Sequence, residues 1–145
     1  MIKVSMVPKD YVLNVWDEVK PHLDKVIEHT HGRFNIDDIL NYLLTDDEFV
    51  LWIAFDEKEI KGAVVTHVTP YPRGKYLCML FCGGVEFETW GDQIVKLMQH
   101  WAHDTGCVAL EASGRPGWAK ILKANGYKPL WQTFELPAAN AGLGD

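Results

Sequence analysis

The sequence has no long apolar run: nowhere do about 18 consecutive apolar residues occur, the length that a membrane-spanning helix requires. The N-terminal stretch places Lys3, Lys9 and Asp10 around a short apolar segment, which is unlike a secretory signal peptide. We therefore expect a cytoplasmic protein with no membrane partner.

Positive charge is scarce as well. The chain has 14 Lys and Arg against 20 Asp and Glu, which gives a net charge of −6. The basic run Lys120, Lys123 and Lys128 lies near an expected helix end, where cations interact favourably with the helix dipole. Because duplex nucleic acid requires several clustered cations at its phosphates, no nucleic-acid partner is expected. The acidic balance favours a cationic partner.

Cysteine is rare too, and the three cysteines, Cys78, Cys82 and Cys107, form no CxxC pair. An odd number of cysteines in apolar, strand-like text indicates small buried side chains and not a disulfide framework. The histidines place no third metal ligand: His29 and His31 flank a turn, and His100 and His103 lie one helical turn apart. We expect no metal site.

The residues that are abundant indicate a folded protein. Hydrophobic residues make up 48%, aromatic residues 12% and charged residues 23% of the 145 residues, as in globular proteins. A chain of this length buries roughly two-thirds of the surface that its unfolded form exposes, which suffices for one core. We expect a single domain over residues 1–137, followed by a flexible tail over residues 138–145, which is small and nearly uncharged.

Hydrophobic periodicity predicts the helices. Apolar residues at helical spacing predict a helix over residues 12–27, which Pro21 is expected to kink or divide. Asn35 is a candidate N-cap for a second helix. Further helices are expected over residues 94–102, ending at Gly106, and after Pro116.

Runs rich in β-formers predict the strands. They cover residues 2–7, 49–55, 60–68, 76–82, 107–111 and 130–136. The second and third runs flank a charged turn and predict an antiparallel hairpin. The order of elements predicts an α+β fold in α/β/α layers, with a mixed, mostly antiparallel sheet of six to seven strands and about four helices.

This order over residues 2–136, the text EIKGAVV at residues 59–65 and the text LKANGY at residues 122–127 resemble the GNAT superfamily of acetyl-CoA-dependent N-acetyltransferases. A second set of residues resembles small GNAT-like proteins carried by tailed bacteriophages. This set comprises Tyr71, Pro72, Gly83, Gly84, Trp90, Trp101, Ala102, Gly106, Cys107, Glu111, Gly114, Arg115, Gly117 and Trp118. The resemblance implies acetyl-CoA as cofactor and, for a phage protein, an infected bacterium with virion or host proteins as partners.

The resemblance implies that the fourth and fifth strands part just after Phe81 and that the cofactor's pantetheine arm lies in the gap. The residues along this gap are Leu80, Phe81, Cys82, Gly83, Gly84 and Val85. Gly83 and Gly84 suit a bulge or a close backbone approach, and they equally suit a strand end with unusual dihedral angles.

The cofactor's pyrophosphate is expected at the start of the next helix, where free N–H groups attract anions. The residues here are Trp90, Gly91, Asp92 and Gln93, and they retain only the first glycine of the family's Q/R-x-x-G-x-G/A pattern. Glu88 and Asp92 bring negative charge, each costing a few tenths to about 1 kcal/mol, so weakened cofactor binding is expected.

Acetyl transfer requires a base for the amine and an acid for the departing thiolate. Glu111 is the first candidate for the base because it closes an apolar strand, and Glu86 is the second. A structural pair of Glu111 with Arg115, or a backbone turn, is the alternative. In the family, a tyrosine four residues before the late glycine acts as the general acid, and Leu122 occupies that position here. Tyr127 is expected to pack in the core.

Two functions remain open at this point. One is an N-acetyltransferase that acts on an amine-bearing small molecule or protein, whose acceptor pocket involves the first two helices and residues 70–74; His67 on its strand is a candidate to face that pocket. The other is a catalytically degenerate protein of the same fold with a binding or virion assembly role. The sequence does not indicate the oligomeric state.

Overall fold

The computed structural model describes residues 1–113 and 119–138, and in this part of the chain five strands form one sheet in the order β1-β2-β3-β4-β5. The strands are β1 (Lys3–Val7), β2 (Phe49–Phe55), β3 (Ile60–Tyr71), β4 (Gly74–Gly84) and β5 (Leu110–Ala112). β1 to β4 pair antiparallel, and β5 pairs parallel to β4. The predicted mixed, mostly antiparallel sheet is confirmed, with fewer strands than the predicted six to seven.

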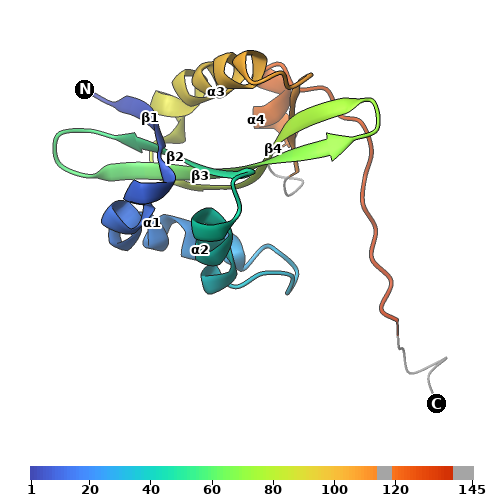
Figure 1. Cartoon of the computed structure of the whole chain (residues 1–145), viewed down its shortest axis with the longest axis horizontal. Coiled ribbons are helices and arrows are strands. Elements are labelled where there is room, and N and C mark those ends of the chain that lie inside the picture. The colour runs from blue at the N-terminus through green and yellow to red at the C-terminus, as the bar shows by residue number, and fades with distance from the viewer. Residues whose placement is uncertain (114–118, 139–145) are drawn as a thin grey trace.

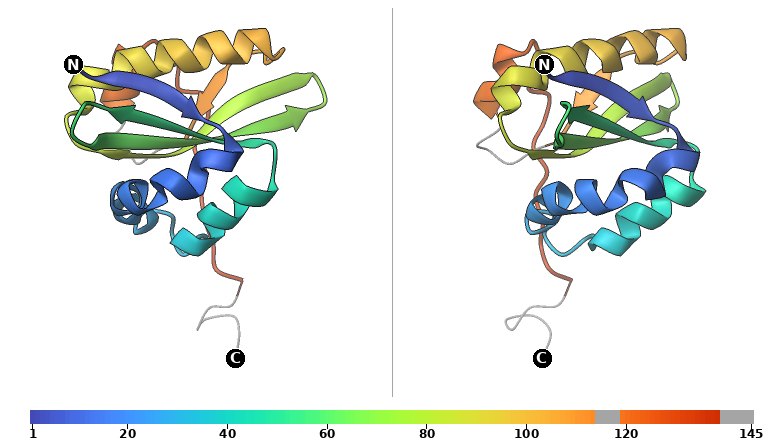
Figure 2. Two further views of the ribbon diagram at one scale, coloured as in Figure 1. Left: turned by 60° about the vertical axis from the view of Figure 1, so that its left-hand side comes forward. Right: turned by 90° about the vertical axis from the view of Figure 1, so that its left-hand side faces the viewer.

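Helices cover both faces of the sheet (Figure 1). One face carries α1 (Val12–Ile27), which follows the short 3-10 turn η1 (Lys9–Tyr11), and α2 (Ile36–Thr45). The other face carries α3 (Phe87–Asp104), with α4 (Ala119–Ala124) beside it. α1 runs without interruption through Pro21, so the expected division does not occur. Figure 2 shows the resulting three layers.

Each layer of helices packs its apolar stripe on the sheet and forms its own core. The core under α1 and α2 includes Trp16, Leu23, Ile39, Leu43 and Phe81. The core under α3 includes Trp52, Trp90, Ile94 and Met98. The sheet between them supplies both cores because successive side chains of a strand point to opposite faces.

The predicted strand over residues 130–136 is wrong for the described structure: this segment is extended but pairs with no strand and leaves the body of the protein (Figure 1). Its apolar and β-branched residues are suited to a sheet, but a strand forms only where the edge of a partner strand is within hydrogen-bonding distance. Most of the expected tail, from residue 139 on, lies outside the described residues, as do Arg115 and Pro116. No helix in the described ranges is long and apolar enough to span a membrane.

Candidate functional site

A β-bulge bends β4 in its middle. Val65 on β3 is opposite Phe81, whereas the next residue, Thr66, is opposite Met79, so Leu80 is an extra residue on β4. Leu80 and Phe81 consequently both pack on the core under α1 and α2. A bulge increases the local bend and twist of its strand, which turns β4 away from its next neighbour.

The described pairing of β4 with β5 ends at this bulge. The two strands pair only from Leu77 to Met79 on β4, while β4 continues to Gly84. The parting of the strands just after Phe81 stays a prediction, because β5 ends at Ala112 and residues 114–118 lie outside the described ranges.

The free edge of β4 beyond the bulge carries backbone hydrogen-bonding groups. The N–H of Val85 donates to the carbonyl of Lys61 on β3 at 2.8 Å. Because the peptide groups of a strand alternate in direction, those of Gly84 and Cys82 point to the opposite edge. Within residues 1–113 and 119–138, no strand pairs with this edge.

The two glycines at the end of β4 allow close approach to their own chain. A Cβ on Gly83 would collide with the carbonyl of His22 in α1, and one on Gly84 with the carbonyl of Lys61. Gly84 also has a φ of +148°, which side chains rarely adopt. Both glycines therefore have a structural role: each lies close to another segment of this chain, and Gly84 is also the strand end with an unusual dihedral angle. The bulge lies at Leu80 and not at these glycines.

The start of α3 follows directly on this edge. Its N-cap residue, Glu86, has a left-handed backbone and no capping side-chain hydrogen bond, so the first N–H groups of the helix lack a side-chain acceptor. Trp90 is fully buried and donates from Nε1 to the carbonyl of Val85 at 2.8 Å, which fixes the loop onto the helix. Gly91 lies against the ring of Phe87, one turn earlier.

The charges around this helix start are only partly balanced. Lys61 contacts Glu86 at 3.0 Å and Glu59 at 2.9 Å, and these hydrogen bonds raise the pKa of Lys61. The side chains of Glu88, Asp92 and Gln93 are exposed. Glu86 is thus an ion-pair partner at the start of α3.

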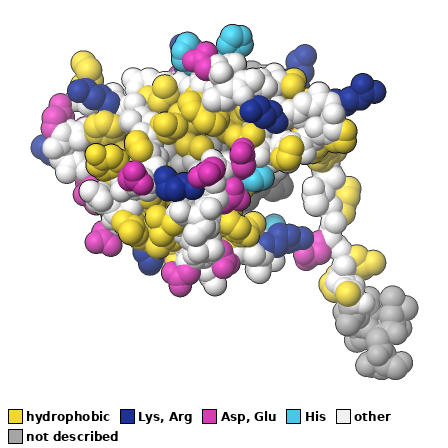
Figure 3. All heavy atoms as spheres, in the orientation of Figure 1, with side chains coloured by type: hydrophobic (Ala, Val, Ile, Leu, Met, Phe, Trp, Pro, Cys, Tyr) yellow, Lys and Arg dark blue, Asp and Glu magenta, His cyan; other side chains and the backbone are white. Residues whose placement is uncertain are grey.

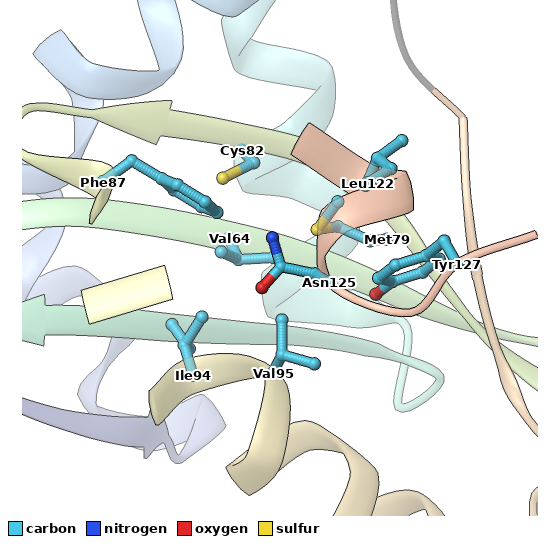
Figure 4. A pocket seen from close by; sticks show the side chains of 9 residues that line it. All are labelled: Val64, Met79, Cys82, Phe87, Ile94, Val95, Leu122, Asn125 and Tyr127. Atoms are coloured by element: carbon cyan, nitrogen blue, oxygen red, sulfur yellow. The ribbon is translucent and has the colours of Figure 1, made fainter. Parts of the chain in front are cut away.

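An apolar slot lies between β4, α3 and the α4 region (Figure 4). It is lined by Val64, Met79, Cys82, Phe87, Ile94, Val95, Leu122, Asn125 and Tyr127. Its volume is about 10 Å³, which is room for about one water molecule. The slot therefore lies beside the free β4 edge and is narrow because side chains of the α4 region fill it.

One polar atom in this slot is unsatisfied. The hydroxyl of Tyr127 is buried and has no hydrogen-bond partner among the described residues. Burial raises the pKa of Tyr127, and it raises the pKa of the Cys82 thiol to about 12. Both groups are therefore protonated at neutral pH. The sequence predicted Tyr127 as a packing residue, and only the fold shows that its buried hydroxyl lacks a described hydrogen-bond partner.

A row of four paired residues, which includes His67, Cys78 and Glu111, crosses the opposite face of the sheet. In the strand register, Phe49 lies opposite His67, His67 opposite Cys78, and Cys78 opposite Glu111. Residues that lie opposite each other on paired strands share one face of the sheet. The ring of Tyr42 from α2 stacks on Phe49, with 4.6 Å between the ring centroids, so the row lies on the face that α1 and α2 cover. His67 thus lies on the side that the sequence suggested for the acceptor.

Glu111 has two described hydrogen-bond donors. The Tyr71 hydroxyl donates to its Oε1 at 3.1 Å, and the Cys78 thiol does so at 3.4 Å. Burial, and then the nearby carboxylate, raise the pKa of Cys78 to about 11, and the hydrogen bond to Glu111 raises the pKa of Tyr71. The suggested partner Arg115 lies outside the described residues.

The two carboxylates proposed as bases lie far apart. Glu111 is level with Cys78, whereas Glu86 follows the end of β4 at Gly84. At about 3.3 Å per strand residue, Cys78 and Gly84 are separated by about 20 Å. The groups that the fold brings to Glu111 are Tyr71, which lies in the range 70–74 expected at the acceptor pocket, and Cys78, which the sequence did not single out as a site residue. The described residues contain no group of three or more potential metal ligands.

Comparison with known proteins gives matches of structure only. No family model matches the sequence, and no curated protein matches it. The aminoglycoside acetyltransferase meta-AAC0020 from an uncultured soil metagenomic sample, solved with sisomicin, is similar at a TM-score of 0.71 and 11% identity, over 96% of both chains. Aminoglycoside N-acetyltransferase AAC(6')-Iy in complex with CoA is similar at a TM-score of 0.68 and 14% identity, over 94% of both chains.

The same aminoglycoside acetyltransferase bound to a bisubstrate analogue of CoA and acetylneamine has a TM-score of 0.69 and 15% identity, over 97% of this chain and 99% of the other. At such identities the likeness is one of fold, and it extends over nearly the whole chain. It shows that this chain has the fold of these acetyltransferases.

Proposed function

We propose that this protein is a GNAT-type N-acetyltransferase that moves an acetyl group from acetyl-CoA to an amine on a small molecule or a protein. The observation that carries the proposal is the end of the β4–β5 pairing at Met79, which leaves the peptide groups of Cys82 and Gly84 on an edge with no partner among the described strands. The solved acetyltransferases with CoA and with a CoA-linked analogue support it through their shared fold.

The residues along β4 and α3 fit this cofactor. The peptide groups of Cys82 and Gly84 would bind the amides of its arm, and Leu80, Phe81, Gly83 and Val85 would hold that edge in place. The first N–H groups of α3, at Phe87 and Glu88, have no side-chain acceptor and would face the pyrophosphate, with Trp90, Gly91, Asp92 and Gln93 in the turn that follows. Lys61 offsets the charge of Glu86, whereas Glu88 and Asp92 weaken binding.

When bound, the cofactor would supply the acetyl group as a thioester, so that an N–C bond to the amine forms as the C–S bond breaks and CoA leaves as a thiolate that takes a proton from water. Glu111 takes the proton of the acceptor amine, directly or through water. It lies on the face of α1 and α2, level with Cys78 and two residues from the bulge, which is about 7 Å along β4. Donor and acceptor then approach the bulge from opposite faces of the sheet.

A thermal melt with millimolar acetyl-CoA, combined with a free-thiol assay on a panel of amines, tests this function. Ligand at about 100 times its dissociation constant adds roughly 2.7 kcal/mol of stability. We expect Glu111→Gln to keep the melting shift and to lower turnover about 100-fold or more. Glu18→Gln, an exposed change on α1, is the control that leaves both unchanged. No melting shift with acetyl-CoA would rule out the function.

A second candidate function is a binding or virion assembly protein of this fold without catalysis. The slot volume of about 10 Å³ favours it, because this space holds about one water molecule. Leu122 favours it too, because it lines the slot at the position where the family has the tyrosine that acts as general acid. The phage setting rests on the resemblance of the sequence alone. A melting shift with acetyl-CoA, but no release of the CoA thiol in the presence of any amine of the panel, would favour this candidate.

A further inference from the structure

The chain after α4 forms an extended arm over residues 128–138 that exposes large apolar side chains. Leu130, Trp131, Phe134 and Leu136 are exposed to 69%, 71%, 85% and 80%. Figure 3 shows hydrophobic side chains of this arm standing away from the body. Soluble proteins rarely leave such a contiguous apolar segment in water, which indicates that a partner covers it.

The arm is directed past the helices and not along the sheet of its own chain. It begins at Tyr127, whose N–H donates to the carbonyl of Leu122 at 3.0 Å. Near its other end, Glu135 contacts Arg33, in the turn between α1 and α2, at 2.8 Å. The arm therefore passes from the α3 side of the sheet to the side of α1 and α2, as Figures 1 and 2 show. Both partners of this ion pair are half-exposed, so the contact is weak.

The same chain has a strand edge to receive such an arm. β5 pairs with β4 on one side, and its other edge has no strand partner in the described ranges. Val108, just before β5, is 61% exposed. An edge strand with free N–H and C=O groups is a template for another extended segment.

We propose that the arm of one copy adds a strand to the free edge of β5 in a second copy, and that the reciprocal exchange gives a two-fold symmetric dimer. A second copy satisfies both the exposed arm and the unpaired β5 edge at once, and because a two-fold exchange is reciprocal, neither arm and neither β5 edge is left over. In this pairing Leu130, Phe134 and Leu136 share one side of the added strand, and Trp131 lies on the other. The proposal is independent of the catalytic function.

Light scattering coupled to size-exclusion chromatography tests the exchange on the full chain. We expect a mass of about 33 kDa, twice 16.5 kDa, at tens of micromolar protein. Phe134→Asp is expected to give the monomer, with the dimer dissociation constant raised at least 10-fold and the melting behaviour of the monomer body retained. The matched control is Leu13→Asp, which charges an equally apolar, 61% exposed position on α1 and keeps the dimer.

A photo-crosslinker at Gln132 separates exchange from pairing within one chain. The proposal requires a crosslinked product of about 33 kDa that joins residue 132 to residues 107–113 of the other copy. A monomeric wild-type protein, a dimer that persists in Phe134→Asp, or crosslinks confined to one chain would each overturn it.

Discussion

At the scale of single residues, the slot is marked by polar groups that have been taken out of water. The Tyr127 hydroxyl has no described partner, and the Cys82 thiol next to it is held protonated by burial. A buried unsatisfied hydroxyl costs free energy in the isolated protein. Such a cost is understandable where a ligand supplies the missing acceptor.

Replacing Tyr127 by Phe tests that interpretation. Because the hydroxyl lacks a partner, we expect the free energy of unfolding of Tyr127→Phe to stay within about 0.5 kcal/mol of the wild type, or to rise. Affinity for acetyl-CoA should fall about 3- to 10-fold, the effect of one hydrogen bond. Denaturant unfolding and calorimetric titration measure the two quantities, with Tyr11→Phe as the control at an exposed tyrosine. A clear loss of stability with unchanged affinity would assign the hydroxyl a structural role.

Cys82 gives a prediction about pH. Burial raises its pKa from 9.0 to about 12 in the folded protein, so folding favours the protonated thiol. That stabilisation is complete below pH 9 and is lost as the pH rises from 9 toward 12, by up to about 1.4 kcal/mol per pH unit for one proton. We expect Cys82→Ala to flatten the fall in unfolding free energy between pH 8.5 and 10.5, measured with urea.

The control for this pH experiment is Cys107→Ala, which removes a thiol outside the slot lining. Cys78, whose pKa is raised to about 11, and Tyr127 act in the same direction, so part of the pH dependence persists in Cys82→Ala. Identical pH profiles for Cys82→Ala and the wild type would show that the thiol is not buried as described.

Glu111 shows what sequence reveals about single residues. Its position at the end of an apolar strand was sufficient to nominate it. Its partners were not predictable, because Tyr71 and Cys78 lie 40 and 33 residues away in the chain. Only the register of β3, β4 and β5 brings these groups together, and register depends on the bulge at Leu80.

At the scale of elements, local signals were reliable and long-range ones were not. Asn35 caps α2 as predicted: its side chain accepts the N–H of Asp38, and the Asp38 side chain accepts the N–H of Asn35, both at 2.9 Å. The hairpin predicted over residues 49–55 and 60–68 also forms, and its second strand continues to Tyr71. The strand predicted over residues 130–136 had the right alternation, but its partner depends on chain geometry far beyond the segment.

The α2 cap can be tested directly. We expect Asn35→Ala to lower the free energy of unfolding by about 1 kcal/mol, because the N–H of Asp38 loses its side-chain acceptor. Asn14→Ala, at an exposed position on α1, should change it by less than about 0.5 kcal/mol. Thermal and urea unfolding of both variants provide the comparison, and equal stabilities would contradict the importance of the capping box.

At the scale of the whole molecule, the sheet separates two different surfaces that meet at the β4 bulge. The α3 side offers the slot and the uncapped helix start, and the side of α1 and α2 offers the row that ends at Glu111. In the proposed function, the two substrates meet near this bulge. The gap that the family resemblance implies after Phe81 stays a prediction, because β5 ends at Ala112 and residues 114–118 lie outside the described ranges.

The most direct test of the account is an amide NMR titration of the labelled full chain with acetyl-CoA. The account predicts saturable shifts of the Cys82 and Gly84 amides and of those in the first turn of α3, while the amides of α2 stay in place. No shifts up to several millimolar acetyl-CoA, or shifts confined to residues away from β4 and α3, would contradict it.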